Sequence, residues 1–313
     1  MIRKEFPDLH WLKKQIEQQF VSKQGWPNCI INARGQSSYR PDIKGTLSLF
    51  MNVKGETRCG VDNQKVQVDT SHFFISNQHQ PYTLEVENTT TETFNIHFSE
   101  KLLSEVYAGL ITPADILIDN HSRIEGQYLH FFNRLYRKEE VFTKLIQRLY
   151  LYSQQEYRNP ILLDELLTDL LVYLMQLHRD IIREMHRISA LKKSTQVEIY
   201  KRLCESLNYL HSFYNKEITL DELSAVACLS KFHYLRLFKS VLHLSPHQYL
   251  LKLRLDKAKE LLQYTQIPVT DISITVGFEN NTSFSRLFQQ RFGQSPLNYR
   301  LASGKKKLAI LVN

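Results

Sequence analysis

The hydrophobic pattern of the C-terminal third predicts helices joined by tight turns. Leu220, Leu223 and Val226 recur at helical spacing behind Thr219, a residue suited to cap a helix, and a second helix follows Ser230. The apolar stripe of that second helix consists of Tyr234, Phe238, Val241 and Leu242. This segment therefore has the pattern of a short helix, a turn and a longer helix.

The same order of elements returns about fifty residues later. The short helix is marked by Val269, Ile272 and Val276, and the stripe of the longer one by Phe284, Phe288 and Phe292. Gly277 lies between them and suits a turn that needs a positive φ. Between the two copies, Pro246 begins a joining helix at the position where a missing N–H group costs least, and the apolar pattern continues to about residue 264.

Matching residues show that the two segments are copies of one unit. Arg236, Leu237 and Phe238 return 50 positions later as Arg286, Leu287 and Phe288, and Ser245, Pro246 and Tyr249 return as Ser295, Pro296 and Tyr299. A fixed internal period is typical of a duplicated supersecondary unit. Each copy has the helix-turn-helix pattern, in which the second helix enters the major groove of DNA.

At these residues the chain resembles a known family. The runs "LDELSAVACLSKFHYLRLFKSVLHLSPHQYLLKLRLDKAKELL" and "VTDISITVGFENNTSFSRLFQQRFGQSPLNYR" resemble the DNA-binding domain of the AraC/XylS family of bacterial transcription regulators. The resemblance covers both helix-turn-helix units and the joining helix. It implies an all-α domain over residues 197–302 that binds double-stranded promoter DNA.

The first half of the chain has a different pattern. Residues 27–100 contain short runs rich in Thr, Val, Ile, Phe and Tyr, such as "GTLSLFMNVKGETRCG", separated by Gly, Asn, Asp and Pro. Strands at this spacing predict an antiparallel barrel or jelly roll. The resemblance implies a cupin-like β-barrel that senses a small molecule, so the expected fold class is α+β.

The other expected segments follow from helical spacing and charge. They are an amphipathic helix or arm at 1–26, a helical dimerisation part of the sensor at 101–186, a linker at 187–196 and a basic tail at 303–313. The arm has Trp11 and Leu12 on its apolar side. Within the helical part, one predicted segment contains Phe131, Phe132, Leu135 and Tyr136. Ser194 or Thr195 is expected to cap the first helix of the DNA-binding domain.

A heptad pattern lies within the helical part. It consists of Leu163, Leu167, Leu170, Leu174, Leu177 and Ile181. Two interpretations remain open: an internal core helix, and a contact between two copies of the chain. The resemblance favours a homodimer.

The candidate DNA contacts are the residues that face away from the two predicted apolar stripes. In the first unit these are Lys231, Phe232, Leu235, Arg236 and Lys239; in the second they are Asn281, Thr282, Ser283, Ser285, Arg286, Gln289 and Gln290. Apolar side chains suit thymine methyl groups, and amides and hydroxyls pair with base edges or phosphates. Arg236 and Arg286 occupy equivalent positions, and a base or a phosphate contact is open for both. His233, Asn280 and Asn298 are further phosphate candidates.

Charge supports this placement. The chain has a formal net charge of +8, with 22 Lys and Arg against 23 Asp and Glu in residues 1–191, and 18 against 9 in residues 192–313. Positive charge confined to the duplicated segment is expected of a surface that binds phosphates. No apolar run is long enough to cross a membrane, and the four cysteines show no metal or disulfide spacing. A cytoplasmic location is expected.

Three other classes of protein would carry different residues. A cupin metalloenzyme would need ligands such as His72, His79 and His97, which lack the spacing of a metal site. A DNA-repair methyltransferase would need an activated Cys, and none of Cys29, Cys59, Cys204 and Cys228 lies in such a motif. An architectural DNA binder would lack a ligand response. The resemblance favours a non-enzymatic activator that contacts RNA polymerase and responds to an unknown effector, without a cofactor.

Overall fold

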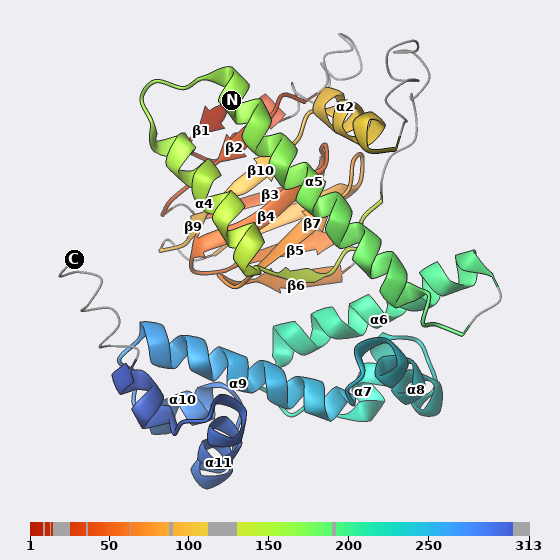
Figure 1. Ribbon diagram of the computed structural model, residues 1–313, viewed down its shortest axis with the longest axis vertical. Helices are drawn as coiled ribbons and strands as arrows, with labels where there is room; N and C mark the ends of the chain where they lie inside the picture. Colours follow the sequence, from red (N-terminus) through yellow and green to blue (C-terminus); the bar gives the residue numbers. More distant parts are fainter. Residues whose placement is uncertain are drawn as a thin grey trace. The chain divides into compact units, whose positions relative to one another are not determined.

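The chain forms two compact units, Met1–His186 and Arg187–Asn313, coloured from red to green and from green to blue in Figure 1. The computed structural model describes residues 1–8, 10–12, 14, 26–35, 37–62, 64–87, 90–111, 130–189 and 192–302. None of the described helices is both long and apolar enough to span a bilayer.

The first unit is built on two β-sheets. The larger runs in the order β1-β2-β10-β4-β7-β11, with β9 paired to β4, and the smaller in the order β3-β8-β5-β6. The strands of the larger sheet are β1 (Ile2–Arg3), β2 (Cys29–Ile31), β4 (Ser48–Lys54), β7 (His72–Ser76), β9 (Glu92–Thr93), β10 (Asn95–His97) and β11 (Leu135–Arg137). Those of the smaller are β3 (Ser38–Lys44), β5 (Thr57–Val61), β6 (Gln64–Val68) and β8 (Pro81–Val86). The predicted β-rich character of residues 27–100 is confirmed.

The two sheets pack face to face around an apolar core. Phe50 and Phe74 of the larger sheet share one buried cluster with Cys59, Tyr82 and Leu84 of the smaller. Strand pairing among the described residues leaves two separate sheets, so the closure into a barrel that the sequence predicts is not seen there. Most neighbouring strands are antiparallel, while β1 and β2 are parallel.

Burial along the strands shows which sheet is covered on both faces. β8 alternates between half-buried and buried residues, as a strand with one solvent face does, whereas every residue of β7 is buried. The second face of β7 lies under helices. Phe73 stacks on Phe142 of α4 (Glu140–Gln154) with ring centroids 4.0 Å apart, and α5 (Pro160–Met185) lies beside α4 (Figure 1).

One predicted helical segment is a strand instead. Leu135–Arg137 forms β11, which pairs antiparallel with β7 through Leu135 opposite Phe74 and Tyr136 opposite Phe73. The prediction of a helix there was wrong, because four apolar residues in a short run fit an edge strand as well as a helix. Helices flank it at α2 (Glu100–Ile111) and α4.

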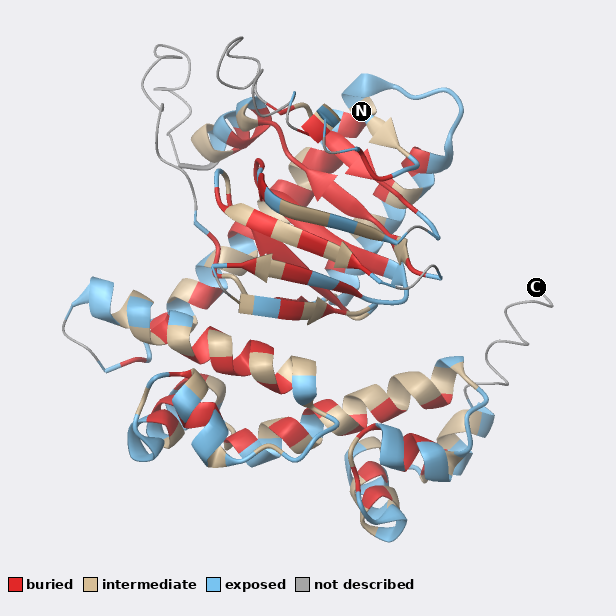
Figure 2. Ribbon diagram, turned by 180° about the vertical axis from the view of Figure 1, so that it is seen from behind, coloured by how far each residue is buried: buried red, intermediate tan, exposed pale blue. Residues whose placement is uncertain are grey.

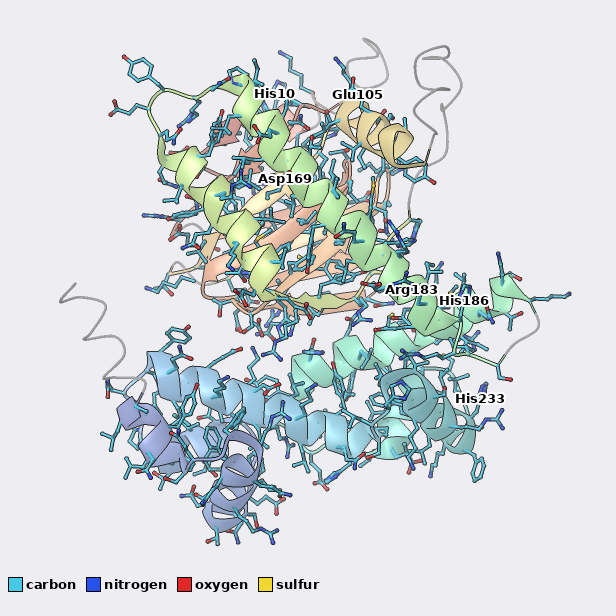
Figure 3. All side chains as sticks on the ribbon, in the orientation of Figure 1. His10, Glu105, Asp169, Arg183, His186 and His233 are labelled. Atoms are coloured by element: carbon cyan, nitrogen blue, oxygen red, sulfur yellow. The ribbon has the colours of Figure 1, made fainter. Side chains whose placement is uncertain are left out.

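The heptad seam of α5 lies inside its own unit. Leu167, Leu170 and Leu174 are fully buried, Leu163 and Ile181 nearly so, and Leu177 is half-buried. Asp169, labelled in Figure 3, accepts a hydrogen bond from Arg148 of α4 at 2.9 Å. The seam therefore packs within one chain, as the first of the two interpretations expects, and the contact between two copies stays a prediction.

The predicted N-terminal helix is described only in part. Residues 10–12 are helical, Leu12 is buried in the core between the sheets, and Trp11 packs its ring edge against Trp26 with centroids 5.9 Å apart. The positions between 15 and 25 fall outside the described residues.

The second unit is helical throughout its described part. Its helices are α6 (Lys193–Phe213), α7 (Leu220–Val226), α8 (Lys231–Leu242), α9 (Pro246–Tyr264), α10 (Val269–Thr275) and α11 (Asn281–Phe292), and residues 296–302 are also helical. The joining helix ends where the sequence predicts. The N-cap of α6 is Lys192 rather than Ser194 or Thr195, a difference of two to three residues. In Figure 2, the buried residues of this unit line the inner sides of its helices.

Candidate nucleic-acid interface

Local hydrogen bonds fix the first helix-turn-helix, α7 and α8. The hydroxyl oxygen of Thr219 accepts a bond from the backbone N–H of Glu222, whose carboxylate accepts one from the N–H of Thr219, so the predicted cap is a full capping box. Ser230 caps α8 as predicted. The turn between the helices places Cys228 at a φ of +48°.

Aromatic side chains hold α8 against the rest of the unit. Tyr234 and Phe238 are fully buried, with ring centroids 5.6 Å apart. The Tyr234 hydroxyl and the Ser206 hydroxyl of α6 form a hydrogen bond of 3.1 Å, and burial raises the pKa of Tyr234. Leu237 is also buried, which the predicted stripe did not include, while Leu242 is half-buried.

The opposite face of α8 is open to solvent. Lys231, Arg236 and Lys239 are exposed, Phe232 is 85% exposed, and Leu235 is half-buried. His233 lies on the outer edge of the helix (Figure 3). The five predicted contacts thus follow one another along a single side of α8. A phenyl ring at this exposure gains nothing from the core of the unit, and a DNA groove lined by thymine methyl groups would cover it.

Lys231 has a partner that the sequence did not suggest. Its ammonium group forms an ion pair with the carboxylate of Asp221 in the first turn of α7. Both side chains are more than half exposed, at 60% and 66%, so the pair contributes little to stability. Lys231 is therefore held only weakly by Asp221. No ion pair of Arg236 or Lys239 is recorded among the described residues.

The second helix-turn-helix, α10 and α11, has the same arrangement of turn, cap and buried stripe but different outward side chains. Gly277 makes the turn at a φ of +91°, and the side chain of Asn280 accepts hydrogen bonds from the backbone of Thr282 and Ser283. Phe284 and Phe288 are fully buried, while Leu287 is half-buried. The cap gives the amide oxygen of Asn280 a structural role, and a phosphate contact of this residue stays a prediction.

The outward face of α11 is polar. Its exposed residues are Asn281, Thr282, Arg286, Gln289 and Gln290, and Ser283 and Ser285 are half-buried. Amides and hydroxyls therefore occupy the side of α11 that corresponds to the mixed basic and apolar side of α8. Side chains of this kind donate to and accept from base edges and phosphates.

Residues 223–302 match the family model described as "Helix-turn-helix domain". They form an AraC-type helix-turn-helix domain. The probable transcriptional regulator LumQ of Photobacterium leiognathi is 40% identical over 93 residues, which cover 30% of this chain and 38% of LumQ. The transcriptional regulator AlkR of Acinetobacter baylyi is 33% identical over 105 residues, or 34% of each chain.

These matches concern the AraC-type domain. The chain spans about a third of the length of these two curated relatives, and both are named as regulators. A solved structure of an AraC-type regulator from Chromobacterium violaceum is 25% identical, with a TM-score of 0.32, and the match covers 36% of this chain and 96% of that one.

The AraC-type domain is held together by contacts between its joining helix and both helix pairs (Figure 1). Tyr249 of α9 bonds to the imidazole of His211 at 2.9 Å on the side of the first pair. On the side of the second, Arg291 of α11 donates to the carboxylate of Asp256 at 2.9 and 3.2 Å. The sequence offered no signal for these pairs, because the partners are 35 or more positions apart.

The histidines considered as metal ligands have separate surroundings. His72 lies 2.9 Å from Asp69, His79 lies 3.6 Å from Glu100, and the ring of His97 is 2.8 Å from the Ser48 hydroxyl. Within the described part of the chain, no group of three or more His, Cys, Asp or Glu side chains is arranged to hold a metal ion. The absence of a cofactor stays a prediction.

Two buried cysteines, Cys29 and Cys59, lack the environment of a nucleophile. All four cysteines are free, and Cys29, Cys59 and Cys204 are buried. Burial raises the pKa of Cys29 to about 11 and that of Cys59 further, which keeps both thiols protonated. A methyl-accepting cysteine needs the opposite shift.

Proposed function

We propose that the chain is a sequence-specific DNA-binding regulator of transcription that reads two half-sites of a promoter with α8 and α11. The observation that carries the proposal is the repeated placement of an exposed contact face on each of these helices, opposite a buried aromatic stripe. An AraC-type domain and the excess of 18 basic over 9 acidic residues in 192–313 support it. The twelve residues predicted to contact DNA are those of the two faces described above.

The two faces differ, so each helix is expected to read a different sequence. Lys231, Phe232 and Arg236 suit phosphates, thymine methyl groups and guanine. Gln289 and Gln290 suit adenine and phosphates. Because the joining helix has 19 residues, it spans about 28 Å, near the roughly 34 Å between successive major-groove faces.

The first unit is proposed to be a cupin-like sensor for a small-molecule effector. Its interior contains a polar atom suited to a ligand: the indole nitrogen of Trp26, which is buried and has no hydrogen-bond partner recorded among the described residues. An effector would change how the regulator, as a homodimer, recruits RNA polymerase in the cytoplasm. A shift in tryptophan fluorescence or thermal unfolding with one metabolite of a panel tests this part.

The DNA-binding part is tested by removing both repeated arginines. The double variant Arg236→Ala/Arg286→Ala should lose specific binding in a mobility-shift assay with DNA selected from a random-sequence pool, because each helix loses a contact to a base or phosphate. The matched control, Lys201→Ala/Lys252→Ala, removes the same charge from exposed positions on α6 and α9 and should keep specific binding. Equal affinity of the two double variants would refute the assignment of the contact faces.

A further inference from the structure

α6 directly precedes the first helix pair in the sequence, yet the residue that follows its end contacts the second pair. Tyr214, directly after α6, packs against the buried cluster formed by α9, α10 and α11, which includes Phe278 and Phe284. Upstream, Leu203, Leu207 and Leu210 of α6 are buried, and Ser206 bonds to Tyr234 of α8. One helix is therefore anchored in both halves of the domain.

Arg254 of the joining helix forms hydrogen bonds with the segment that follows α6. From the middle of α9, its Nε donates to the carbonyl oxygen of Tyr214 and its Nη2 to that of Lys216, each at 2.7 Å. The guanidinium carbon lies 5.9 Å from the ring centroid of Phe278, which follows the turn of the second pair. Arg254 is half-buried; its bond to Tyr214 is partly shielded from water, whereas its bond to Lys216 is exposed, and both have a charged donor group.

The turn of the second helix pair lies against the same segment. Gly277 approaches the backbone of Asn215 so closely that a Cβ atom at position 277 would lie 2.7 Å from the Asn215 carbonyl oxygen. Residues 214–216, Arg254 and residues 277–278 thus meet at one place, which we call the junction. Without the junction, the two helix pairs would be connected by α9 and its own packing alone.

We propose that the junction fixes the separation and rotation of α8 and α11, and that Arg254 is the positioning residue that makes the chain read two half-sites at one spacing only. This rests on the proposed function. Two linked binding elements gain affinity when a rigid connection matches the distance between their sites, and lose it when the distance differs. One inserted base pair moves a half-site by about 3.4 Å along the DNA and turns it by roughly 35°, so a rigid reader should detect it.

The test uses the full chain and duplexes that it selects from a random-sequence pool. Affinity is measured for the selected site, for sites with one or two base pairs inserted between the half-sites, and for each half-site alone. For the unaltered chain, one inserted base pair should lower affinity about tenfold or more, the loss expected when a contact of roughly 1.4 kcal/mol is forfeited. For Arg254→Met, which keeps an apolar stem, the same insertion should lower affinity less than about threefold, while binding to single half-sites stays unchanged.

Two further variants separate positioning from folding. Arg254→Lys keeps the charge and one donor group, so it should restore part of the spacing preference, and Lys252→Met on the exposed side of α9 should leave it intact. If Arg254→Met does not unfold cooperatively, Arg254→Lys carries the comparison. A variant that weakens binding to every duplex by the same factor would show a merely structural role and overturn the proposal. So would an unaltered chain that tolerates the insertions.

Failure of the inference is distinguishable from failure of the proposed function. If the chain selects no sequence from the pool, regulation through specific DNA binding is wrong and the inference falls with it. If it selects one and the spacing preference of Arg254→Met equals that of the unaltered chain, the function stands and only the role of Arg254 is wrong.

Discussion

The α-carbon of Gly277 faces the backbone of Asn215, and a Cβ atom at position 277 would lie 2.7 Å from the Asn215 carbonyl oxygen and 2.9 Å from its carbonyl carbon. Cys228 holds the equivalent place in the first copy, also at a positive φ, and its side chain is exposed. The same turn therefore tolerates a side chain in one copy and excludes it in the other. The difference lies in what packs opposite the turn.

Gly277→Ala should destabilise the AraC-type domain more than Gly293→Ala does. Both glycines have positive φ, at +91° and +74°, so each alanine costs about 1–2 kcal/mol of backbone strain. At Gly293 no atom lies within 4 Å of the added Cβ, whereas at Gly277 it meets the backbone of Asn215. Chemical denaturation followed by far-UV circular dichroism measures the difference. Equal losses of stability would mean that the contact with Asn215 relaxes at no cost.

Leu170→Ala should lower the stability of the first unit by about 2–5 kcal/mol, because it opens a cavity at a fully buried position of α5. The control, Ile161→Ala, changes a residue of the same helix that is 77% exposed and should shift stability by less than about 0.5 kcal/mol. Both tryptophans of the chain, Trp11 and Trp26, lie in this unit, so their fluorescence follows its unfolding. Suppose instead that Leu170→Ala has unchanged stability and sediments as a monomer, while the unaltered chain sediments as a dimer. The seam would then be a contact between two copies of the chain.

Asp221→Asn should raise affinity for DNA about two- to fivefold, since an exposed ion pair holds Lys231 by no more than about 1 kcal/mol. Removing the carboxylate frees the ammonium group for a phosphate. Asp271→Asn, in the first turn of α10, makes the same charge change where no ion pair is recorded among the described residues. Binding measured at two salt concentrations distinguishes the two. An equal gain from Asp271→Asn would mean that general charge, not Lys231, is responsible.

The stability of the first unit should fall as the pH is lowered from 6.5 to 4, because the buried His97 resists protonation. Burial lowers the pKa of His97 from its usual 6.5 to about 4, and its recorded neighbours Ser48, Trp26 and Phe50 carry no charge. Below pH 6.5 the unfolded chain takes up a proton that the buried ring does not, so stability is present above that pH and lost towards pH 4. The full effect is about 3 kcal/mol, the order of magnitude that follows from the two pKa values.

His97→Gln removes this titration and should flatten the pH profile of the tryptophan-monitored unfolding free energy, even though the variant is less stable at neutral pH. His10→Gln, at an exposed position, should leave the profile unchanged. Parallel profiles of His97→Gln and the unaltered chain would show that other groups cause the loss.

Features set by neighbours in sequence could be predicted without the structure. The caps at Thr219 and Ser230, the start of α9 at Pro246 and the turn at Gly277 all lie where the pattern indicates. Each depends on bonds or torsion angles within about four residues, so the local sequence contains the whole cause. The β-rich character of residues 27–100 followed in the same way from short runs rich in Thr, Val, Ile, Phe and Tyr between turn residues.

Features set by packing between distant segments could not be predicted from the sequence. The heptad of α5 has the same spacing whether its leucines face a sheet of their own chain or a second copy, and only the structure shows that Leu170 is buried within its own chain. Likewise, the run around Leu135 became a strand because β7 offered it an unpaired edge.

The sequence by itself determined a doubled helix-turn-helix with caps at Thr219 and Ser230, its joining helix and the outward faces of its second helices, because helical periodicity and capping act within a few residues. The tertiary structure alone decided that Arg254 reaches carbonyl groups 40 and 38 positions away and that Gly277 has the backbone of Asn215 against it. Contacts across such separations form only when the whole domain has packed, so no local pattern of residues specifies them.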